Sequence, residues 1–242
     1  MTLADAVRAA LAAQADASKA GPMQAYMKSA MPFLGIAAPL RRQVVKQAAR
    51  GLLCTDVAGL SKALLALWEP ARYREERYAA LDLLRLTPHR RLVVSEMRLG
   101  LDLGLLPAVE SMLRTGPWWD FNDEISGQVL PLLLQGRPTE MKSRLRQWAR
   151  SDDLWFRRAA MLAQRALKQE FDAVLLYDCI LPSLGDPRFE REFFIRKGMG
   201  WALRERSYAA PDEVRAFCRE YAAQLSPLTV REALKVLQRR AR

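Results

Sequence analysis

Apolar residues recur every three or four positions along almost the whole chain, as Leu3, Val7 and Leu11 do near the amino terminus. This spacing gathers apolar side chains on one face of an α-helix, whereas a half-buried strand requires alternation at every second residue. Such alternating runs are hard to find, and Pro, Gly, Thr and Asp stand where helices would begin or end. Thr229 and Glu232 have the spacing of a capping box at the start of the last helix. The sequence therefore predicts an all-α chain of roughly a dozen helices.

A degenerate repeat runs through the helical pattern. The segments 155–162 and 194–201 each carry an aromatic residue, a second bulky residue and two cations, at a spacing of 39 residues. In a helical chain, a period near 40 is typical of stacked helix pairs of the HEAT-like or armadillo-like kind. We therefore expect residues 1–242 to form a single domain, a curved solenoid of HEAT-like repeats.

The repeat also groups particular side chains. Equivalent positions of successive repeats line up along the concave face of a solenoid. Trp119 and Asp123 lie four residues apart and share a helix face, as do Lys197 and Trp201. Arg158 occupies the equivalent position of the repeat between them. The sequence thus predicts one groove that carries two aromatic rings, a carboxylate and two cations.

The net charge of the chain is strongly positive. Lys and Arg number 38 against 27 Asp and Glu, which gives a formal charge of +11. Residues 137–168 hold nine cations and three acids, so a net +6 lies in one repeat. A basic stripe along a concave solenoid suits the phosphate backbone of a nucleic acid. The alternative is that Arg, which outnumbers Lys 30 to 8, reflects genome composition and only solvates helix faces.

The rare residues exclude several kinds of site. Cys54, Cys179 and Cys218 form no C-x-x-C pair, which argues against a disulfide framework or a thiolate zinc site and predicts small core residues in a reducing compartment. The single histidine, His89, is expected in a loop and excludes a histidine-rich metal site. The scattered glycines form no phosphate-binding loop. We therefore expect neither a metal nor another cofactor.

Membrane association is not expected either. No stretch approaches the roughly 18 apolar residues that a membrane span needs. The first segment lacks the basic start and apolar block of a signal peptide. We therefore expect a cytoplasmic protein, acting as a monomer.

Four segments of the chain resemble, in the same order, the motifs of the AlkD-type DNA alkylation-repair glycosylases. The third and fourth segments include the repeated units described above, and the second has the form W-W-D-x-x-D. Together the segments lie between residues 23 and about 237. They are residues 26–36 followed by Arg41 and Arg42, then 118–123, 151–160 and 192–205.

The resemblance implies a HEAT-like solenoid that grips duplex DNA. It also implies a glycosylase that hydrolyses the N-glycosidic bond of positively charged N3- and N7-alkylated purines, such as 3-methyladenine and 7-methylguanine, in base excision repair. Most glycosylases flip the base out of the helix, and this family is expected not to. By motif position, the catalytic group is Asp123 with Trp119 and Trp201, and the DNA contacts are Tyr26 and Arg158, to which the basic charge adds Lys197 and Arg204.

The chemistry fits these residue types. An alkylated purine is already cationic, so its glycosidic bond is weakened and cleavage develops an oxocarbenium-like sugar. Negative charge near C1′ and a positioned water then help more than a general acid. Asp123 lies near the start of a helix expected to begin at about Trp119, where amide dipoles favour the ionised form. Asn122 departs from the apolar residue of some relatives and bears on the hydrogen bonding of Asp123.

Each assignment has a simpler alternative. Asp123 could be a first-turn carboxylate paired to a cation, and Arg158 could be a salt-bridge partner. Trp119 and Trp201 could be core residues, and Tyr26 could pack within an amphipathic helix. At the level of function, the alternatives are a non-catalytic HEAT-like protein that recognises distorted or branched DNA, and a protein-interaction scaffold.

Overall fold

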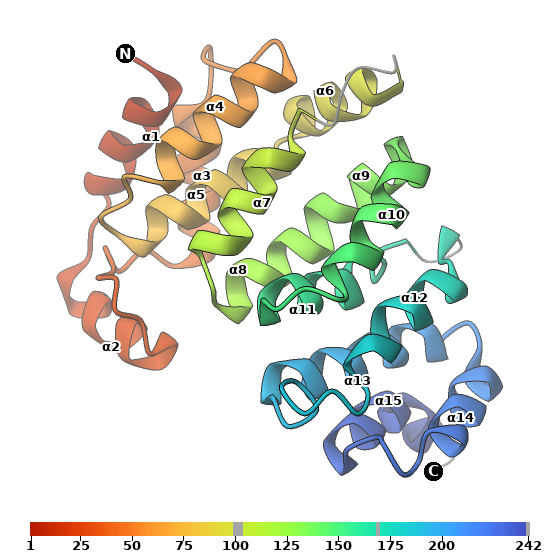
Figure 1. Cartoon of the computed structure of the whole chain (residues 1–242). Helices are drawn as coiled ribbons and strands as arrows, with labels where there is room; N and C mark the ends of the chain where they lie inside the picture. The colour runs from red at the N-terminus through yellow and green to blue at the C-terminus, as the bar shows by residue number, and fades with distance from the viewer. Residues whose placement is uncertain (99–103, 168–169, 241–242) are drawn as a thin grey trace. The chain divides into compact units, whose positions relative to one another are not determined.

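The structure is a computed structural model that describes residues 1–98, 104–167 and 170–240. These residues form helices and no strand, which confirms the all-α class (Figure 1). The chain divides into two compact units, Met1–Thr115 and Gly116–Arg242. The expected single domain and its concave basic groove stay predictions. Lys168, at the end of the basic segment, lies outside the described residues.

The first unit packs its helices in pairs. Helices α1, α4 and α7 lie side by side, α3 packs against α1, and α5 packs against α3 and α4. The apolar spacing of the sequence faces inward, since Val7, Leu11, Leu60 and Leu64 are fully buried. The helices of this unit are α1 (Leu3–Ala12), α2 (Ala17–Met27), α3 (Ala38–Ala48), α4 (Val57–Trp68), α5 (Arg74–Arg85), α6 (Thr87–Arg98) and α7 (Leu106–Thr115).

Side-chain caps fix where several of these helices begin. Thr2 and Asp5 form a reciprocal capping box at α1. Asp16 accepts the backbone N–H of Ser18 at α2, and Asp56 caps α4. Each cap satisfies an amide that the first helical turn leaves without a partner, which stabilises the helix by about 1 kcal/mol.

A buried carboxylate holds the loop between α2 and α3. Glu75 is fully buried and accepts the backbone N–H groups of Leu34, Gly35 and Ile36 at 2.9, 2.9 and 3.1 Å. Gly35 has a φ of +85°, and a Cβ there would lie 2.1 Å from the carbonyl oxygen of Asp16. Only glycine fits this position, and the loop is fixed by packing and by Glu75.

His89 was expected in a loop, and this expectation is wrong. The residue is buried and lies in the first turn of α6. The helix can begin before it because Pro88 stands in the first turn, where proline is tolerated. Its Nε2 accepts the backbone N–H of Cys54 at 3.2 Å, and its Nδ1 lies 2.9 Å from the carbonyl oxygen of Leu83. The imidazole therefore joins the loop before α4 to the last turn of α5, and its burial lowers its pKa.

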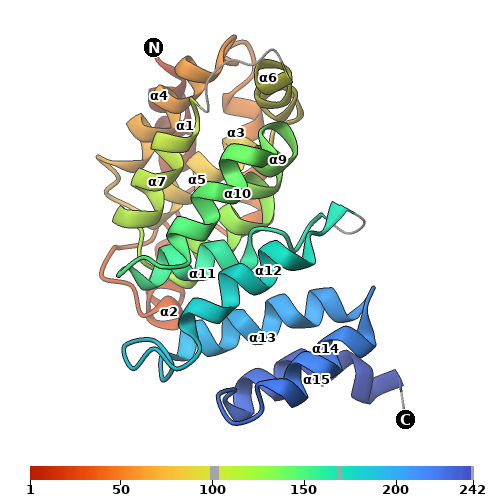
Figure 2. The same ribbon diagram turned by 45° about the vertical axis from the view of Figure 1, so that its right-hand side comes forward.

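The second unit stacks α8, α11, α13 and α15 in succession, and α12 packs on α10, α11 and α13 (Figure 2). Helices α11 and α13 begin 39 residues apart, as the sequence repeat predicts. The elements are α8 (Trp119–Glu124), a π-helical turn (Ile125–Val129), α9 (Leu130–Gly136), α10 (Pro138–Trp148), α11 (Leu154–Leu162), α12 (Ala173–Ile180), a short 3-10 helix (Leu181–Ser183), α13 (Phe193–Ser207), α14 (Pro211–Glu220) and α15 (Pro227–Arg240).

The core of the second unit contains two of the three cysteines. Cys179 and Cys218 are buried among apolar side chains such as Leu176 and Phe217, as expected, and Cys54 of the first unit is half-buried. Burial raises the pKa of Cys179 to about 12. Within the described ranges, no helix combines the length and apolar character needed to cross a bilayer. No three His, Cys, Asp or Glu side chains of these ranges gather closely enough to hold a metal ion.

The buried imidazole makes stability depend on pH. Because the folded pKa of His89 lies below its ordinary value of 6.5, the unfolded chain binds a proton that the folded chain excludes. The stability from neutral His89 is present above about pH 6.5 and is lost as the pH falls through the folded pKa. We expect urea unfolding to show a lower free energy at about pH 5.5 than at about pH 7.5, with a smaller difference in His89→Gln. Equal pH dependence of the two proteins would contradict this role.

Candidate functional site

Asp123 and Arg158 form a two-pronged ion pair between α8 and α11. Nε of Arg158 donates to Oδ1 of Asp123 at 2.9 Å, and Nη2 donates to Oδ2 at 3.0 Å. The side chain of Asp123 is 15% exposed, and that of Arg158 is 3% exposed. The third nitrogen, Nη1, donates to the carbonyl oxygen of Phe194 in α13 at 2.5 Å. Paired hydrogen bonds of this kind fix orientation as well as distance, so Asp123 is held in one geometry.

A glycine makes room for this guanidinium. A Cβ at Gly198 would lie 2.9 Å from Nη1 of Arg158 and 3.5 Å from its Cγ. Glycine inside a helix destabilises it by about 1 kcal/mol relative to alanine. At Gly198 the missing side chain leaves the space that the Arg158 guanidinium occupies.

The salt-bridge alternative for Arg158 is the arrangement observed. The guanidinium is buried and already bonded to Asp123 and Phe194. Its expected contact with the DNA backbone is not tested by this arrangement and stays a prediction.

Helix α8 begins at Trp119, as expected, and Asp123 follows one turn later on the same helix face. Trp119 is half-buried. Asn122 is buried, and its Nδ2 donates to the carbonyl oxygen of Trp155 at 2.7 Å. Asn122, the residue expected to differ from the apolar residue of some relatives, therefore joins α8 to the first turn of α11.

Sequence reasoning missed the role of Arg165, which it counted only as positive charge. Its Cζ lies 4.2 Å from the centroid of the Trp201 ring, and its Nη2 donates to the backbone carbonyl of Asp123 at 2.6 Å. The half-buried Trp201 also donates from Nε1 to Glu205 at 2.9 Å. Arg165 thus links the Trp201 ring to the backbone of Asp123 through contacts that no local spacing revealed.

Lys197 and Arg204 share one carboxylate. Lys197 donates to Oε1 of Glu232 at 2.8 Å, and Arg204 donates to Oε2 at 2.7 Å. The hydrogen bond from Lys197 lowers the pKa of Glu232. The prediction of a capping box at Thr229 and Glu232 is therefore wrong. The Glu232 carboxylate binds Lys197 and Arg204 of α13, and the side chain of Ser226 accepts the backbone N–H of Thr229. DNA contact by the two cations stays a prediction.

Tyr26 lies in the first unit, near the end of α2, and is 80% exposed. The alternative that it packs within its helix is not what the structure shows. Its ring is accessible to a partner, and its contact with DNA stays a prediction.

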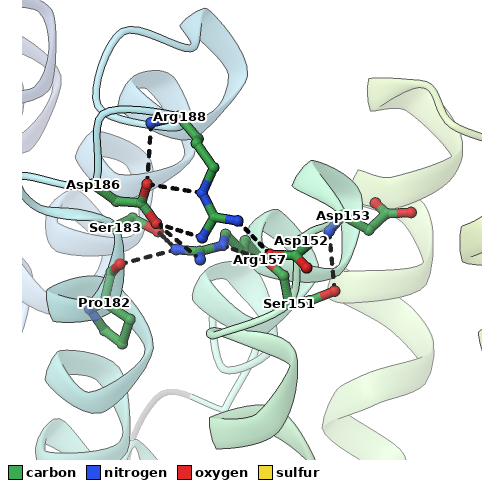
Figure 3. Close-up of polar contacts among 8 residues, drawn as sticks. All are labelled: Ser151, Asp152, Asp153, Arg157, Pro182, Ser183, Asp186 and Arg188. Atoms are coloured by element: carbon green, nitrogen blue, oxygen red, sulfur yellow. Dashed lines mark hydrogen bonds and ion pairs between the residues drawn. The ribbon is translucent and has the colours of Figure 1, made fainter.

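Buried hydrogen bonds hold the start of α11, which carries Arg158. Figure 3 shows the guanidinium of Arg157 directed toward the segment that carries Pro182, Ser183 and Asp186. Its Nε donates to the carbonyl oxygen of Ser151 at 2.6 Å, and Nη1 donates to the carbonyl oxygen of Pro182 at 2.9 Å. Nη1 also donates to Ser183, and Nη2 pairs with Asp186 at 3.1 Å. The third sequence motif therefore contains one arginine that anchors the helix and one that faces Asp123.

A family model described as "DNA alkylation repair enzyme" matches residues 7–237. The chain belongs to this DNA alkylation repair family. The resemblance carried by the four sequence motifs is thereby confirmed. Membership implies an enzyme of DNA repair, with DNA as its substrate.

One solved structure also resembles this family member. It is described as "Predicted DNA alkylation repair enzyme from Enterococcus faecalis" and is 27% identical in sequence. The match covers 91% of this chain and 95% of that chain, with a TM-score of 0.75. No curated protein matches the chain.

The anchor at Arg157 makes a stability prediction for this family member. Arg157→Met should lower the free energy of unfolding by about 3 kcal/mol, because Asp186 and two carbonyl groups lose a buried partner. Arg191→Met is the matched control, since the Arg191 side chain is 90% exposed and pairs with its neighbour Glu190. Urea unfolding followed by circular dichroism measures both, and equal effects would contradict the anchoring role.

Proposed function

We propose that the protein is a DNA glycosylase that hydrolyses the N-glycosidic bond of positively charged N3- and N7-alkylated purines in duplex DNA, without base flipping, at the start of base excision repair. The observation that carries the proposal is the Asp123 carboxylate, held in a fixed orientation by Arg158 and tied through Arg165 to the indole of Trp201. Family membership supports DNA repair as the setting.

The reaction does not require a general acid, because the alkylated base already carries a positive charge. When the bond between C1′ and the purine nitrogen breaks, its electron pair moves to the cationic base, which leaves neutral. The sugar becomes an oxocarbenium ion, and water adds to C1′ and loses a proton to give the abasic site. Negative charge beside C1′ stabilises this transition state if it is already oriented.

The ion pair supplies oriented charge. Arg158 uses two of the roughly four lone-pair directions of a carboxylate, so others remain for a sugar or a water. Asp123 is the more exposed partner, at 15% against 3%, so the pair presents its negative end outward. A carboxylate fixed in this way needs no reorganisation as positive charge develops.

The two half-buried indoles suit the same substrate. Trp119 shares a helix face with Asp123, and Trp201 is linked to the backbone of Asp123 through Arg165. Aromatic faces pack well on deoxyribose, and their attraction for a developing cation contributes about 0.5–2 kcal/mol each.

The first test of the proposal is removal of the charge on Asp123. Asp123→Asn keeps the shape of the side chain and one oxygen for Arg158, so we expect excision of 7-methylguanine to fall by about 100-fold or more. Binding to undamaged duplex should remain within about threefold, because phosphate contacts carry it. Release of free base under single-turnover conditions measures the first quantity, and fluorescence anisotropy measures the second.

Asp212→Asn is the control for this test, because Asp212 is 92% exposed and pairs only with Arg215 of its own helix among the contacts described. Circular dichroism verifies that each variant folds. Excision by Asp123→Asn at the wild-type rate rules the assignment out. Salt-sensitive DNA binding with no excision by wild type favours the non-catalytic DNA-binding alternative.

The absence of base flipping has its own test. An enzyme that encloses the flipped base in a pocket excludes bulky adducts, whereas one that acts on the exposed sugar does not. We expect release of a bulky N7-alkylguanine at a rate within about tenfold of 7-methylguanine. The same base-release assay on matched duplexes compares them. A bulky adduct that binds and is not released indicates an enclosing pocket instead.

A further inference from the structure

We infer that Arg165 is a positioning residue for the excision reaction, holding the ring of Trp201 and the backbone of Asp123 in one arrangement. The inference rests on the proposed function and adds to it a residue that neither the sequence motifs nor the family match assigns. Three observations support it: the contacts of the Arg165 guanidinium, the close approach of Gly127 to that group, and the unfavourable burial of its charge.

The contacts of Arg165 join two helices that carry the candidate catalytic residues. Nη2 donates to the carbonyl oxygen of Asp123 in α8 at 2.6 Å, and Cζ lies 4.2 Å from the Trp201 ring in α13. A planar guanidinium can stack on a ring and donate in its own plane at the same time, which an ammonium cannot do. Arg165 therefore sets the separation of Trp201 from Asp123.

The backbone next to Asp123 is shaped to admit this side chain. Gly127 lies in the π-helical turn Ile125–Val129, and a Cβ on it would lie 2.2 Å from Nη2 of Arg165 and 2.6 Å from Nε. Any other residue there would displace the guanidinium from its place. π-helical turns are rare and frequently occur at functional sites. Here the turn follows directly on the helix that carries Asp123.

Burial of this guanidinium is unfavourable by itself. Its Nη1 is buried and has no hydrogen-bond partner among the described residues, and desolvation lowers the pKa of Arg165. The charges of Asp123, Glu124 and Glu205 offset part of that effect. An apolar side chain of similar size would fill the same space without this cost. A charged group kept under such conditions is typical of a functional site.

The geometry also says how Arg165 acts. Its Cζ lies over the Trp201 ring at 4.2 Å from the centroid, closer than the Cζ of Arg204 at 5.8 Å, so Arg165 is the nearer cation on this ring. Its reach to Asp123 ends on the backbone carbonyl and not on the carboxylate. Arg165 thus acts through Trp201 and Asp123 and does not touch the sugar.

The test combines kinetics with a double-mutant cycle. Arg165→Met should lower the single-turnover excision rate by about tenfold, while the Kd for undamaged duplex stays within about twofold. In a Trp201→Phe background, the same change should cost less than about threefold, because its effect passes through the indole. Arg215→Met, on the exposed surface of α14, is the control and should leave the rate unchanged.

A spectroscopic signature separates positioning from general damage. In protein labelled with 5-fluorotryptophan, the ¹⁹F resonance of Trp201 is assigned by its loss in Trp201→Phe. It should shift in Arg165→Met and stay in place in Arg215→Met. If Arg165→Met is unfolded by circular dichroism, Arg165→Lys carries the test, since it keeps the charge and loses the planar group.

The outcomes are distinguishable from those of the proposed function. If wild type releases no alkylated purine, the proposed function falls and the role of Arg165 falls with it. If wild type is active and the folded Arg165 variant matches its rate, or if the losses in the double-mutant cycle simply add, only the role of Arg165 is overturned. A shifted Trp201 resonance with a slower, non-additive excision rate supports it.

Discussion

The partly buried pair of Asp123 and Arg158 is the interaction on which the second unit depends. Each charge would be costly to bury alone, and loss of one partner from such a pair costs about 3–5 kcal/mol. Arg158 also bonds to the carbonyl of Phe194, so one guanidinium connects α8, α11 and α13. The packing of three helices and the orientation of the candidate catalytic carboxylate are thus set by the same side chain.

Internal arginines recur in both units, and they change the meaning of the basic composition. The side chains of Arg41, Arg157 and Arg158 are 9%, 3% and 3% exposed, and each pairs with an aspartate from another part of its unit. These cations hold elements together and are not free to bind phosphate. The count of 38 Lys and Arg therefore overstates the number of cations that the surface offers to DNA, whereas the net charge of +11 is unaffected because each pair is neutral.

Helical periodicity and the 39-residue register were enough to predict the helices and to group Trp119, Asp123 and Arg158, because positions one repeat apart come to neighbouring helices. Contacts outside that register could not be found in the same way. Arg165 follows the end of α11, and Glu232 reaches back from α15, so only the three-dimensional packing brings them to the site.

The loop held by Glu75 has a consequence for anion binding by the first unit. Three successive backbone N–H groups, from Leu34 to Ile36, converge on one point, and such an amide nest ordinarily attracts phosphate. Here the protein's own carboxylate already fills the nest. This loop is therefore closed to outside anions, and the DNA contact proposed for this unit rests instead on a projecting side chain, Tyr26.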